Sequence, residues 1–312
     1  MSKVGAFING VYPRTDTLAQ LTRDFDRHRV SAADVKKQQR KDFDSLLSVQ
    51  KEAGLDFLED GKISWQDIFR PIVEASDGIE VGALTRWFDN NTFYRQPVIK
   101  GRVKLNTKKL DEYFQKVDKW KVTLISPFTF AKLAEDDFNG SFEKTFEVIV
   151  ELYRALVGYL VGKKVVFVQF NEPYIPFYQV KKSEIVLMGA GIEEIVNGVD
   201  VKVGVHGYFG DCAELVKTLA GNGAIDALGV DFVRTSLVSL PKGLKQDIIA
   251  GVLEGRNSLL EEKKTIIAFV EKLRKQFGEN IIYLSNNSDL DLLPERVAKE
   301  KVKLLGEIVS SL

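Results

Sequence analysis

The stretch "VKVGVHGYFGDCAELVK" (residues 201–217) combines a strand, a turn and the start of a helix. Its first seven residues are mostly apolar on both faces, which is typical of a strand buried in a parallel sheet. A glycine-containing turn follows, and a helical pattern begins after it. The stretch indicates a βα unit. It also holds His206 and the single cysteine, Cys212, which raises the question of whether it belongs to a metal site.

Seven further apolar runs of the same kind occur along the chain, and helical patterns separate most of them. The clearest helical pattern covers 142–161, and Ser31 with Asp34 resembles the start of another helix. Eight buried strands that alternate with helices over 312 residues predict an α/β fold, the (β/α)8 TIM barrel. The other predicted strands are 4–9, 55–59, 122–126, 165–170, 226–233, 247–255 and 280–286.

The connection between the second and third predicted strands, from about residue 60 to 121, is too long for a single crossover helix. We interpret it as an insertion within a single barrel domain of residues 1–312, because no linker-like composition divides the chain. The insertion contains "TRWFDNNTFYRQPVI" (85–99), which is rich in aromatic and polar residues. A long loop at the carboxyl end of a barrel strand is a candidate for function.

Composition excludes several classes of function. Lysine plus arginine and aspartate plus glutamate both number 44, and zero net charge argues against a nucleic-acid-binding scaffold. One cysteine excludes an internal disulfide and an all-thiolate zinc site. No apolar run is long enough to span a membrane, and residues 1–16 do not resemble a signal peptide. We therefore expect a cytoplasmic protein with no nucleic-acid or membrane partner.

Barrel enzymes build their sites from residues that follow the strands. Polar side chains at these places could form such a site, or they could be hydrogen-bonded loop residues with no ligand; the sequence leaves both open. The candidates for substrate binding are Arg14, Asn171, Glu172, His206, Asp231 and Arg256.

Several motifs resemble the cobalamin-independent methionine synthase family. "GVYPR" (10–14) and "VQFNEP" (168–173) are the first two, and others follow in the family's order over nearly the whole chain. Most are more similar to the family's N-terminal, non-catalytic barrel than to its catalytic barrel. They include "KEAGLDFLEDGKISWQD" (51–67), "TRWFDNNTFYRQP" (85–97), "SPFTFAKLA" (126–134), "YFGDCAEL" (208–215), "GVDFVR" (229–234), "GVLEGRN" (251–257) and "LSNNSDLDLLP" (284–294).

The resemblance bears on whether His206 and Cys212 belong to a metal site. The family's catalytic barrel holds zinc through a histidine, two cysteines and a glutamate, and zinc keeps the homocysteine sulfur as a nucleophilic thiolate. Here His206 lies near the first position, but Tyr208 and Ser288 stand where the cysteines would be, and Asp231 replaces the glutamate. We therefore expect no zinc in this chain, and we interpret His206 and Cys212 as structural.

The resemblance also points to possible ligand contacts. The family's Asp-Glu-Pro at the homocysteine site reads Asn171-Glu172-Pro173 here, which lacks one charge. A lysine that contacts the glutamate tail of the folate is replaced by Arg86, although Arg86 could equally form a surface ion pair. The second basic run of the family is absent at 19–22. The aromatic residues at 87–94 could stack on a pterin, but they could equally form a small core.

The first hypothesis is therefore an accessory subunit in methionine biosynthesis. It would act with a separately encoded catalytic methionine-synthase barrel in methyl transfer from a folate-like donor to homocysteine. The alternative is a stand-alone methyltransferase with a different donor or acceptor. A third possibility is a structural relic whose pocket is filled by its own side chains.

Overall fold

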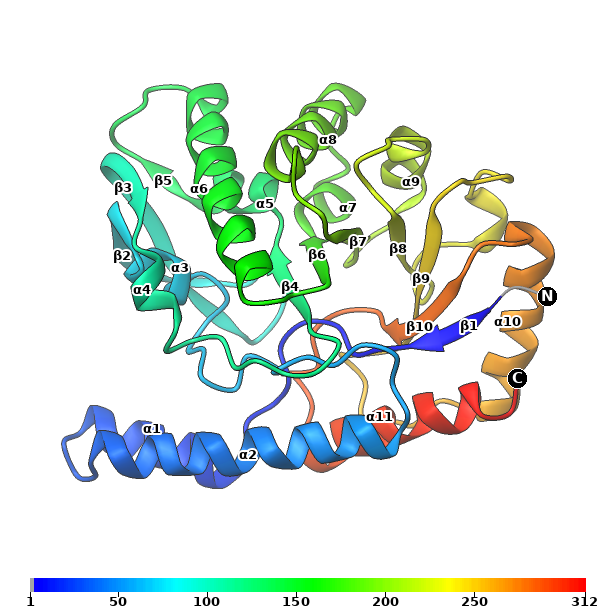
Figure 1. Ribbon diagram of the computed structural model, residues 1–312, viewed down its shortest axis with the longest axis horizontal. Coiled ribbons are helices and arrows are strands. Elements are labelled where there is room, and N and C mark those ends of the chain that lie inside the picture. The colour runs from blue at the N-terminus through cyan, green and yellow to red at the C-terminus, as the bar shows by residue number, and fades with distance from the viewer. Residues whose placement is uncertain (1–2) are drawn as a thin grey trace.

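A computed structural model describes residues 3–312 and contains a curved, all-parallel, seven-stranded sheet with helices on its outside (Figure 1). The strand order is β1-β10-β9-β8-β7-β6-β4. An α/β fold is therefore confirmed. The strands are β1 (Val4–Ala6), β4 (Lys121–Ile125), β6 (Phe167–Glu172), β7 (Lys202–Gly207), β8 (Ala227–Asp231), β9 (Asp247–Leu253) and β10 (Ile282–Asn286).

Seven of the eight predicted strands overlap with these elements. The run at 165–170, for example, corresponds to β6, and the opening stretch forms β7. Residues of neighbouring strands are in register, so Asn171 pairs with His206, and His206 pairs with Gly229. Because the sheet is parallel, the carboxyl ends of its strands lie along one edge.

The predicted strand 55–59 is wrong as a strand. Within the described residues it forms only an isolated bridge between Leu58 and Trp120. Its main chain contacts both neighbours: the Asp56 amide donates to the Ala6 carbonyl at 2.9 Å, and the Leu58 amide donates to the Lys119 carbonyl at 3.2 Å. The Asp56 carboxylate accepts from the Ala6 amide, so a side chain stands in for a ladder bond. A complete eight-stranded barrel is thus not established.

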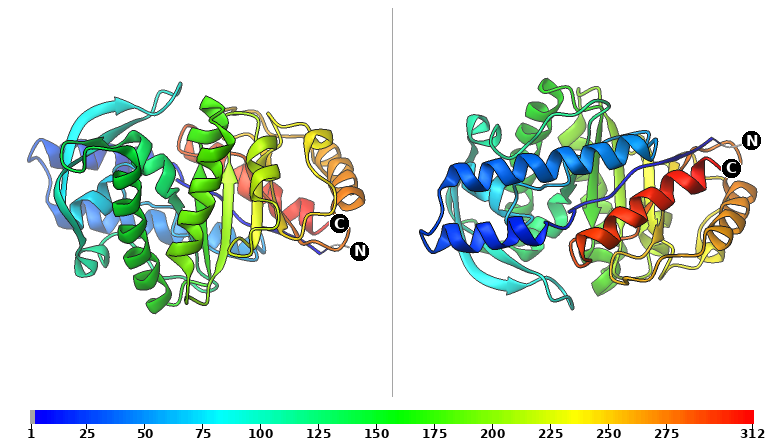
Figure 2. Two further views of the ribbon diagram at one scale, coloured as in Figure 1. Left: turned by 90° about the horizontal axis from the view of Figure 1, so that it is seen from above. Right: turned by 90° about the horizontal axis from the view of Figure 1, so that it is seen from below.

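Helices pack on the outside of the sheet, and α2 packs against both α1 and α11 on one side of the molecule (Figure 2). Ser31 and Asp34 form the predicted capping box of α2, and the pattern at 142–161 forms α6. None of the helices in residues 3–312 has the length and hydropathy needed for a membrane span. The helices are α1 (Asp16–Asp26), α2 (Ala32–Glu52), α5 (Pro127–Leu133), α6 (Phe142–Gly162), α7 (Tyr174–Tyr178), α8 (Lys182–Val196), α9 (Ala213–Leu219), the short η1 (Leu237–Ser239), α10 (Lys263–Phe277) and α11 (Glu295–Val309).

Residues 60–121 contain a long antiparallel hairpin of β2 (Ser76–Arg86) and β3 (Phe93–Leu105). Two short helices flank it, α3 (Arg70–Glu74) and α4 (Thr107–Leu110), and β3 also pairs with β5 (Glu135–Asp136). In Figure 2 the hairpin extends along one end of the molecule.

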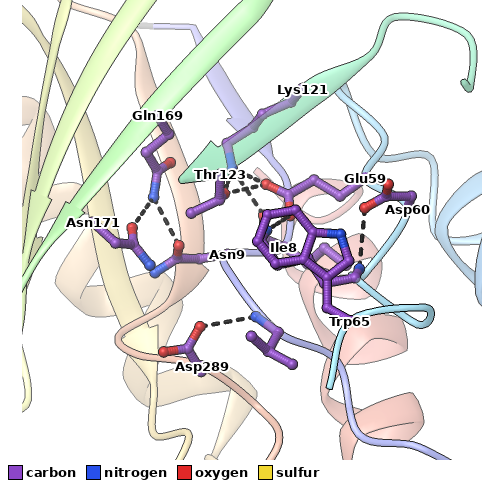
Figure 3. Close-up of polar contacts among 12 residues, drawn as sticks. Ile8, Asn9, Glu59, Asp60, Trp65, Lys121, Thr123, Gln169, Asn171 and Asp289 are labelled. Carbon is purple, nitrogen blue, oxygen red and sulfur yellow. Dashed lines mark hydrogen bonds and ion pairs between the residues drawn. The ribbon is translucent and has the colours of Figure 1, made fainter. Parts of the chain in front are cut away.

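An ion pair between Lys121 and Glu59 lies inside the curved sheet and is fully buried (Figure 3). The Lys121 ammonium also donates to Thr123 at 2.8 Å and lies 4.6 Å from the centre of the Phe7 ring. Burial lowers the pKa of Lys121 to about 8, and the nearby Glu59 opposes this shift. The pair links the 55–59 segment to β4, where a regular ladder is missing.

Lys121→Met should destabilise the protein strongly, because it leaves the Glu59 carboxylate buried without its closest cation. We expect a loss of about 3–5 kcal/mol in the free energy of unfolding, measured by urea titration. Lys163→Met is the matched control: its ion pair with Asp111 is half-exposed, so it should cost less than about 1 kcal/mol. Equal effects of the two substitutions would contradict a structural role for the buried pair.

Candidate functional site

A pocket of about 700 Å³ lies at the carboxyl ends of β1 and β10, beside the hairpin. Four segments line it, within residues 11–19, 65–68, 87–94 and 289–296. The first follows β1 and the last follows β10. The pocket therefore occupies the edge of the sheet at which α/β folds usually bind ligands.

The turn after β1 places Asp289 at the pocket. Gly10 has a φ of +79°, and a Cβ at this position would lie 1.9 Å from Asp289 Oδ1. Only glycine fits both the backbone conformation and the close approach. The Asp289 carboxylate accepts from the Val11 amide at 2.8 Å and from the Tyr208 hydroxyl at 3.0 Å. These bonds tie the loop after β10 to β1 and to the residue after β7.

Carboxylates outnumber guanidinium groups in the pocket lining. Arg14 donates to the Trp65 carbonyl, and burial lowers the pKa of its guanidinium. Burial raises the pKa values of Asp289 and Asp291, and for Asp291 the neighbouring Asp289 charge adds to the effect. The charged lining residues are Asp16, Asp67, Asp289, Asp291 and Glu295 against Arg14 and Arg296. An acidic pocket of this kind favours neutral or cationic ligand groups.

Aromatic side chains form much of the pocket wall. Trp87 and Tyr94 are 5% and 3% exposed, and both pack against Phe69 with ring centroids 6.0 and 4.9 Å apart. These residues form a small core, which was one of the two alternatives for the aromatic residues at 87–94. Trp87, Tyr94 and the exposed Phe93 nevertheless also line the pocket, so a planar ligand could contact them.

Asn171 and Glu172 lie at the end of β6, outside the pocket lining, and both are buried. The Glu172 carboxylate accepts from Ser126 and, at 2.7 Å, from Thr129, and it also accepts from the Ile175 amide. Burial raises the pKa of Glu172. Its hydrogen bonds hold α5 and α7 against β6, while Asn171 accepts from Gln169 at 2.8 Å (Figure 3).

His206 and Asp231 meet through Asn287. His206 Nε2 lies 2.7 Å from the Asn287 carbonyl and must donate, because a carbonyl only accepts. The Asn287 amide donates to Asp231 Oδ1 at 2.9 Å. Within the described residues, His206 Nδ1 and Asp231 Oδ2 have no hydrogen-bond partner, although Arg234 Nε lies 3.9 Å from the latter. Burial lowers the pKa of His206 to about 4 and raises that of Asp231.

These residues do not fit the zinc site of the catalytic barrel. The Tyr208 hydroxyl is bound to Asp289, and the Ser288 hydroxyl donates to the Asn287 side chain at 3.2 Å. Cys212 is buried directly before α9, and burial raises the pKa of its thiol to about 12. Residues 3–312 contain no cluster of three or more His, Cys, Asp or Glu side chains suited to a metal ion.

Arg86 and Arg256 both contact the tip of the hairpin. Arg86 donates to the Asn90 carbonyl at 2.7 Å and to the Asn91 side chain at 2.9 Å. Arg256 forms a two-pronged ion pair with Asp89, in which both N···O distances are 3.2 Å. As ligand contacts, both arginines remain predictions.

The structure therefore places one of the seven predicted site residues, Arg14, in the pocket lining. Asp289 follows the last predicted strand, where polar site residues were expected, but the sequence analysis did not single out Tyr12, Trp65 or Asp291. One signal could have indicated Asp291: "SDLDLLP" (288–294) places a second carboxylate two positions after Asp289.

His206 predicts a specific pH dependence of stability. Its pKa is about 4 in the folded protein against 6.5 ordinarily, so the unfolded chain binds the proton first as the pH falls. The resulting loss in the free energy of unfolding is absent above about pH 6.5. It increases as the pH falls and reaches roughly 3 kcal/mol at pH 4. His206→Gln should keep the bond to Asn287 and flatten this slope in urea titrations at several pH values.

His28 is exposed and supplies the matched control. His28→Gln should leave the slope between pH 4 and 6.5 as in the wild type. A slope that His206→Gln does not change would contradict the buried, neutral state of His206.

Comparison with known proteins agrees with the architecture. A structure of a B12-independent methionine synthase from Shewanella sp. W3-18-1, in complex with selenomethionine, has a TM-score of 0.71 at 19% identity and covers 91% of each chain. A structure from Listeria monocytogenes has a TM-score of 0.77 at 16% identity, covering 99% of this chain and 98% of that one. At these identities the similarity establishes the fold alone.

Two relatives differ in how much of their length this chain spans. A methionine synthase of Sulfolobus acidocaldarius is 25% identical over 310 residues, which cover 94% of this chain and 87% of that protein. A 5-methyltetrahydropteroyltriglutamate–homocysteine methyltransferase of Campylobacter jejuni is 27% identical over 212 residues, which cover 64% of this chain but only 28% of the relative.

The sequence model described as "Cobalamin-independent synthase, N-terminal domain" matches residues 76–278, which is more than half of the chain and includes the hairpin and strands β4 to β9. The chain therefore belongs to the family of cobalamin-independent synthase N-terminal domains.

Proposed function

We propose that this protein takes part in methionine biosynthesis as an accessory subunit for methyl transfer to homocysteine. It would act with a separately encoded catalytic barrel. The observation that carries the proposal is the combination of N-terminal-domain family membership with a zinc position that lacks both thiolates and whose histidine nitrogen is bound to Asn287. The names of the Sulfolobus and Campylobacter relatives support the reaction class.

The pocket is the proposed place for a folate-like methyl donor. Its volume suits a ligand of that size, and its aromatic walls offer surfaces for a planar ring. Burial raises the pKa of Asp291 to about 8, so this carboxyl is largely neutral near pH 7. The other acidic side chains still outnumber the two guanidinium groups of the lining, which disfavours the several negative charges of a polyglutamate tail. We therefore propose a donor whose tail is short or lies outside the pocket.

We also propose that the chain forms one complete barrel domain. The main-chain bonds of residues 55–59 to both β1 and β4 support closure of the sheet into a barrel. Residues 1–312 would then form one domain, with about 60–121 as an insertion after the second barrel position. A cytoplasmic location, with no nucleic-acid or membrane partner, fits a biosynthetic role.

The alternative is a stand-alone methyltransferase with a different donor or acceptor. The pocket, which a purely structural relic would not need, favours it over the relic. Among the described residues, however, no activated thiol lies at the pocket, because Cys212 is buried elsewhere and its pKa is raised.

The test is methionine formation from homocysteine and a methyl donor. The chain alone, the catalytic barrel alone and the two together would be assayed side by side. We expect no product from the chain alone, and a higher rate from the mixture than from the catalytic barrel alone. Product from the chain alone would establish the alternative, and a mixture no faster than the catalytic barrel would contradict the accessory role.

A second prediction concerns the charge of the donor. Titration calorimetry should show that the triglutamate form of 5-methyltetrahydropteroyl donors binds no more tightly than the monoglutamate form at low salt. Asp16→Asn removes an exposed acidic group from the lining and should improve triglutamate binding by a few-fold. Asp118→Asn, at an exposed carboxylate outside the pocket lining, is the control and should change neither affinity. Tighter binding of the triglutamate to the unaltered protein would contradict the charge argument.

A further inference from the structure

The tip of the hairpin, residues 87–92, lies over the carboxyl ends of three strands. The Phe88 ring packs against Phe177, which lies in α7 after β6, with ring centroids 5.0 Å apart. It also packs against Phe209, after β7, at 5.6 Å. Arg256, after β9, pairs with Asp89 and lies 5.4 Å from the Phe209 ring. The tip thus bridges parts of the chain that are far apart in sequence.

Hydrogen bonds within the tip stabilise its conformation. Arg86 donates to the Asn90 carbonyl and to the Asn91 side chain, and the Trp87 amide donates to the Thr92 carbonyl at 2.9 Å. Phe88 adopts a φ of 50°, a left-handed conformation that is unfavourable for a bulky residue. The unfavourable backbone is compensated only while the Phe88 ring is packed. A tip of this kind should move as one unit.

The tip contacts the strand ends through the Arg256–Asp89 ion pair and the Phe88 ring, and the ion pair lies close to solvent. The side chains of Arg256 and Asp89 are 24% and 53% exposed, and ion pairs at this exposure are weak and are screened by salt. Phe88 supplies the apolar contact. The base of the tip is held more firmly, because Trp87 and the adjoining Tyr94 are buried on Phe69.

The same tip borders the pocket, since Trp87 and residues 92–94 line it. We propose that residues 88–91, which lie between the pocket-lining Trp87 and Thr92, form a lid beside the pocket, and that the Arg256–Asp89 ion pair and the Phe88 ring latch it in the closed position. Release of the latch would widen the pocket on the hairpin side and let the ligand enter. The inference rests on the proposed function in that it takes this pocket as the ligand site, but lid motion can be measured without any ligand.

The experiment places 4-fluorophenylalanine at position 88 of the full chain and follows its ¹⁹F resonance. A packed ring and a solvent-exposed ring differ in chemical shift, so the spectrum reports the open fraction directly. Arg256→Gln should raise the open fraction about threefold to fivefold, the ratio expected for loss of a partly exposed ion pair. One molar sodium chloride should act in the same direction on the unaltered protein.

Two further variants make the test specific. Lys100→Gln removes the exposed Lys100–Asp137 pair in the middle of β3 and should leave the resonance unchanged. Exchange of the charges in Asp89→Arg/Arg256→Asp should restore the closed fraction, which a merely destabilised hairpin would not do. An open fraction that is the same in the unaltered protein and in Arg256→Gln would overturn the lid.

Stopped-flow binding of 5-methyltetrahydropteroyl monoglutamate tests the lid and the proposed donor-binding function separately. With a lid on the donor pocket, Arg256→Gln should speed both association and dissociation. Opening without any donor binding would contradict the proposed function and leave the lid standing. Donor binding with the same rates in both proteins would contradict the lid alone.

Discussion

The buried ion pair between Lys121 and Glu59 is the interaction on which the rest of the structure depends. A parallel sheet normally closes by ladder hydrogen bonds, but residues 55–59 make only a bridge. The buried charge pair adds to the few main-chain hydrogen bonds that hold this segment. The pair is stable in an apolar interior because the ammonium also bonds to Thr123 and to the Ile8 carbonyl, which places all three neighbouring segments around one cation.

The pocket depends on that junction. The residue after Glu59 is Asp60, whose carboxylate accepts from the amides of Lys62 and Gln115 and so shapes the following turn. The turn leads to Trp65, whose carbonyl receives the Arg14 guanidinium. The wall of the pocket is thus built outward from a buried charge, and Arg14 is oriented by the backbone of that wall. A ligand would meet a preformed surface rather than free side chains.

At the other strand ends the polar residues are already bonded to one another. Glu172 is enclosed by Ser126, Thr129 and the Ile175 amide, and His206 reaches Asn287 across β8 and β9. Gly229 makes this possible, because a Cβ there would lie 2.2 Å from His206 Nδ1. The His206–Asp231 position is therefore part of the internal packing, while the pocket lies on the β1–β10 side of the sheet.

Much of the fold could be predicted from the sequence, because strands buried on both faces give unbroken apolar runs. The run at 55–59 is apolar too, but side-chain bonds from Asp56 and Glu59 replaced its ladder, and such long-range partners leave no local pattern. The site was harder to predict. Arg86 and Arg256 contact the hairpin tip and do not line the pocket, and Arg256 pairs with Asp89, which is 167 positions away in the sequence. No spacing rule predicts that contact.

The most direct test of the pocket assignment is a crystal structure of the protein soaked with 5-methyltetrahydropteroyl monoglutamate. The account predicts ligand density against Trp87 and Tyr94, with its ring system near Asp289 and Asp291 and its tail toward solvent. Density at the His206–Asp231 position would contradict the account, and so would a saturating soak that leaves the pocket without ligand.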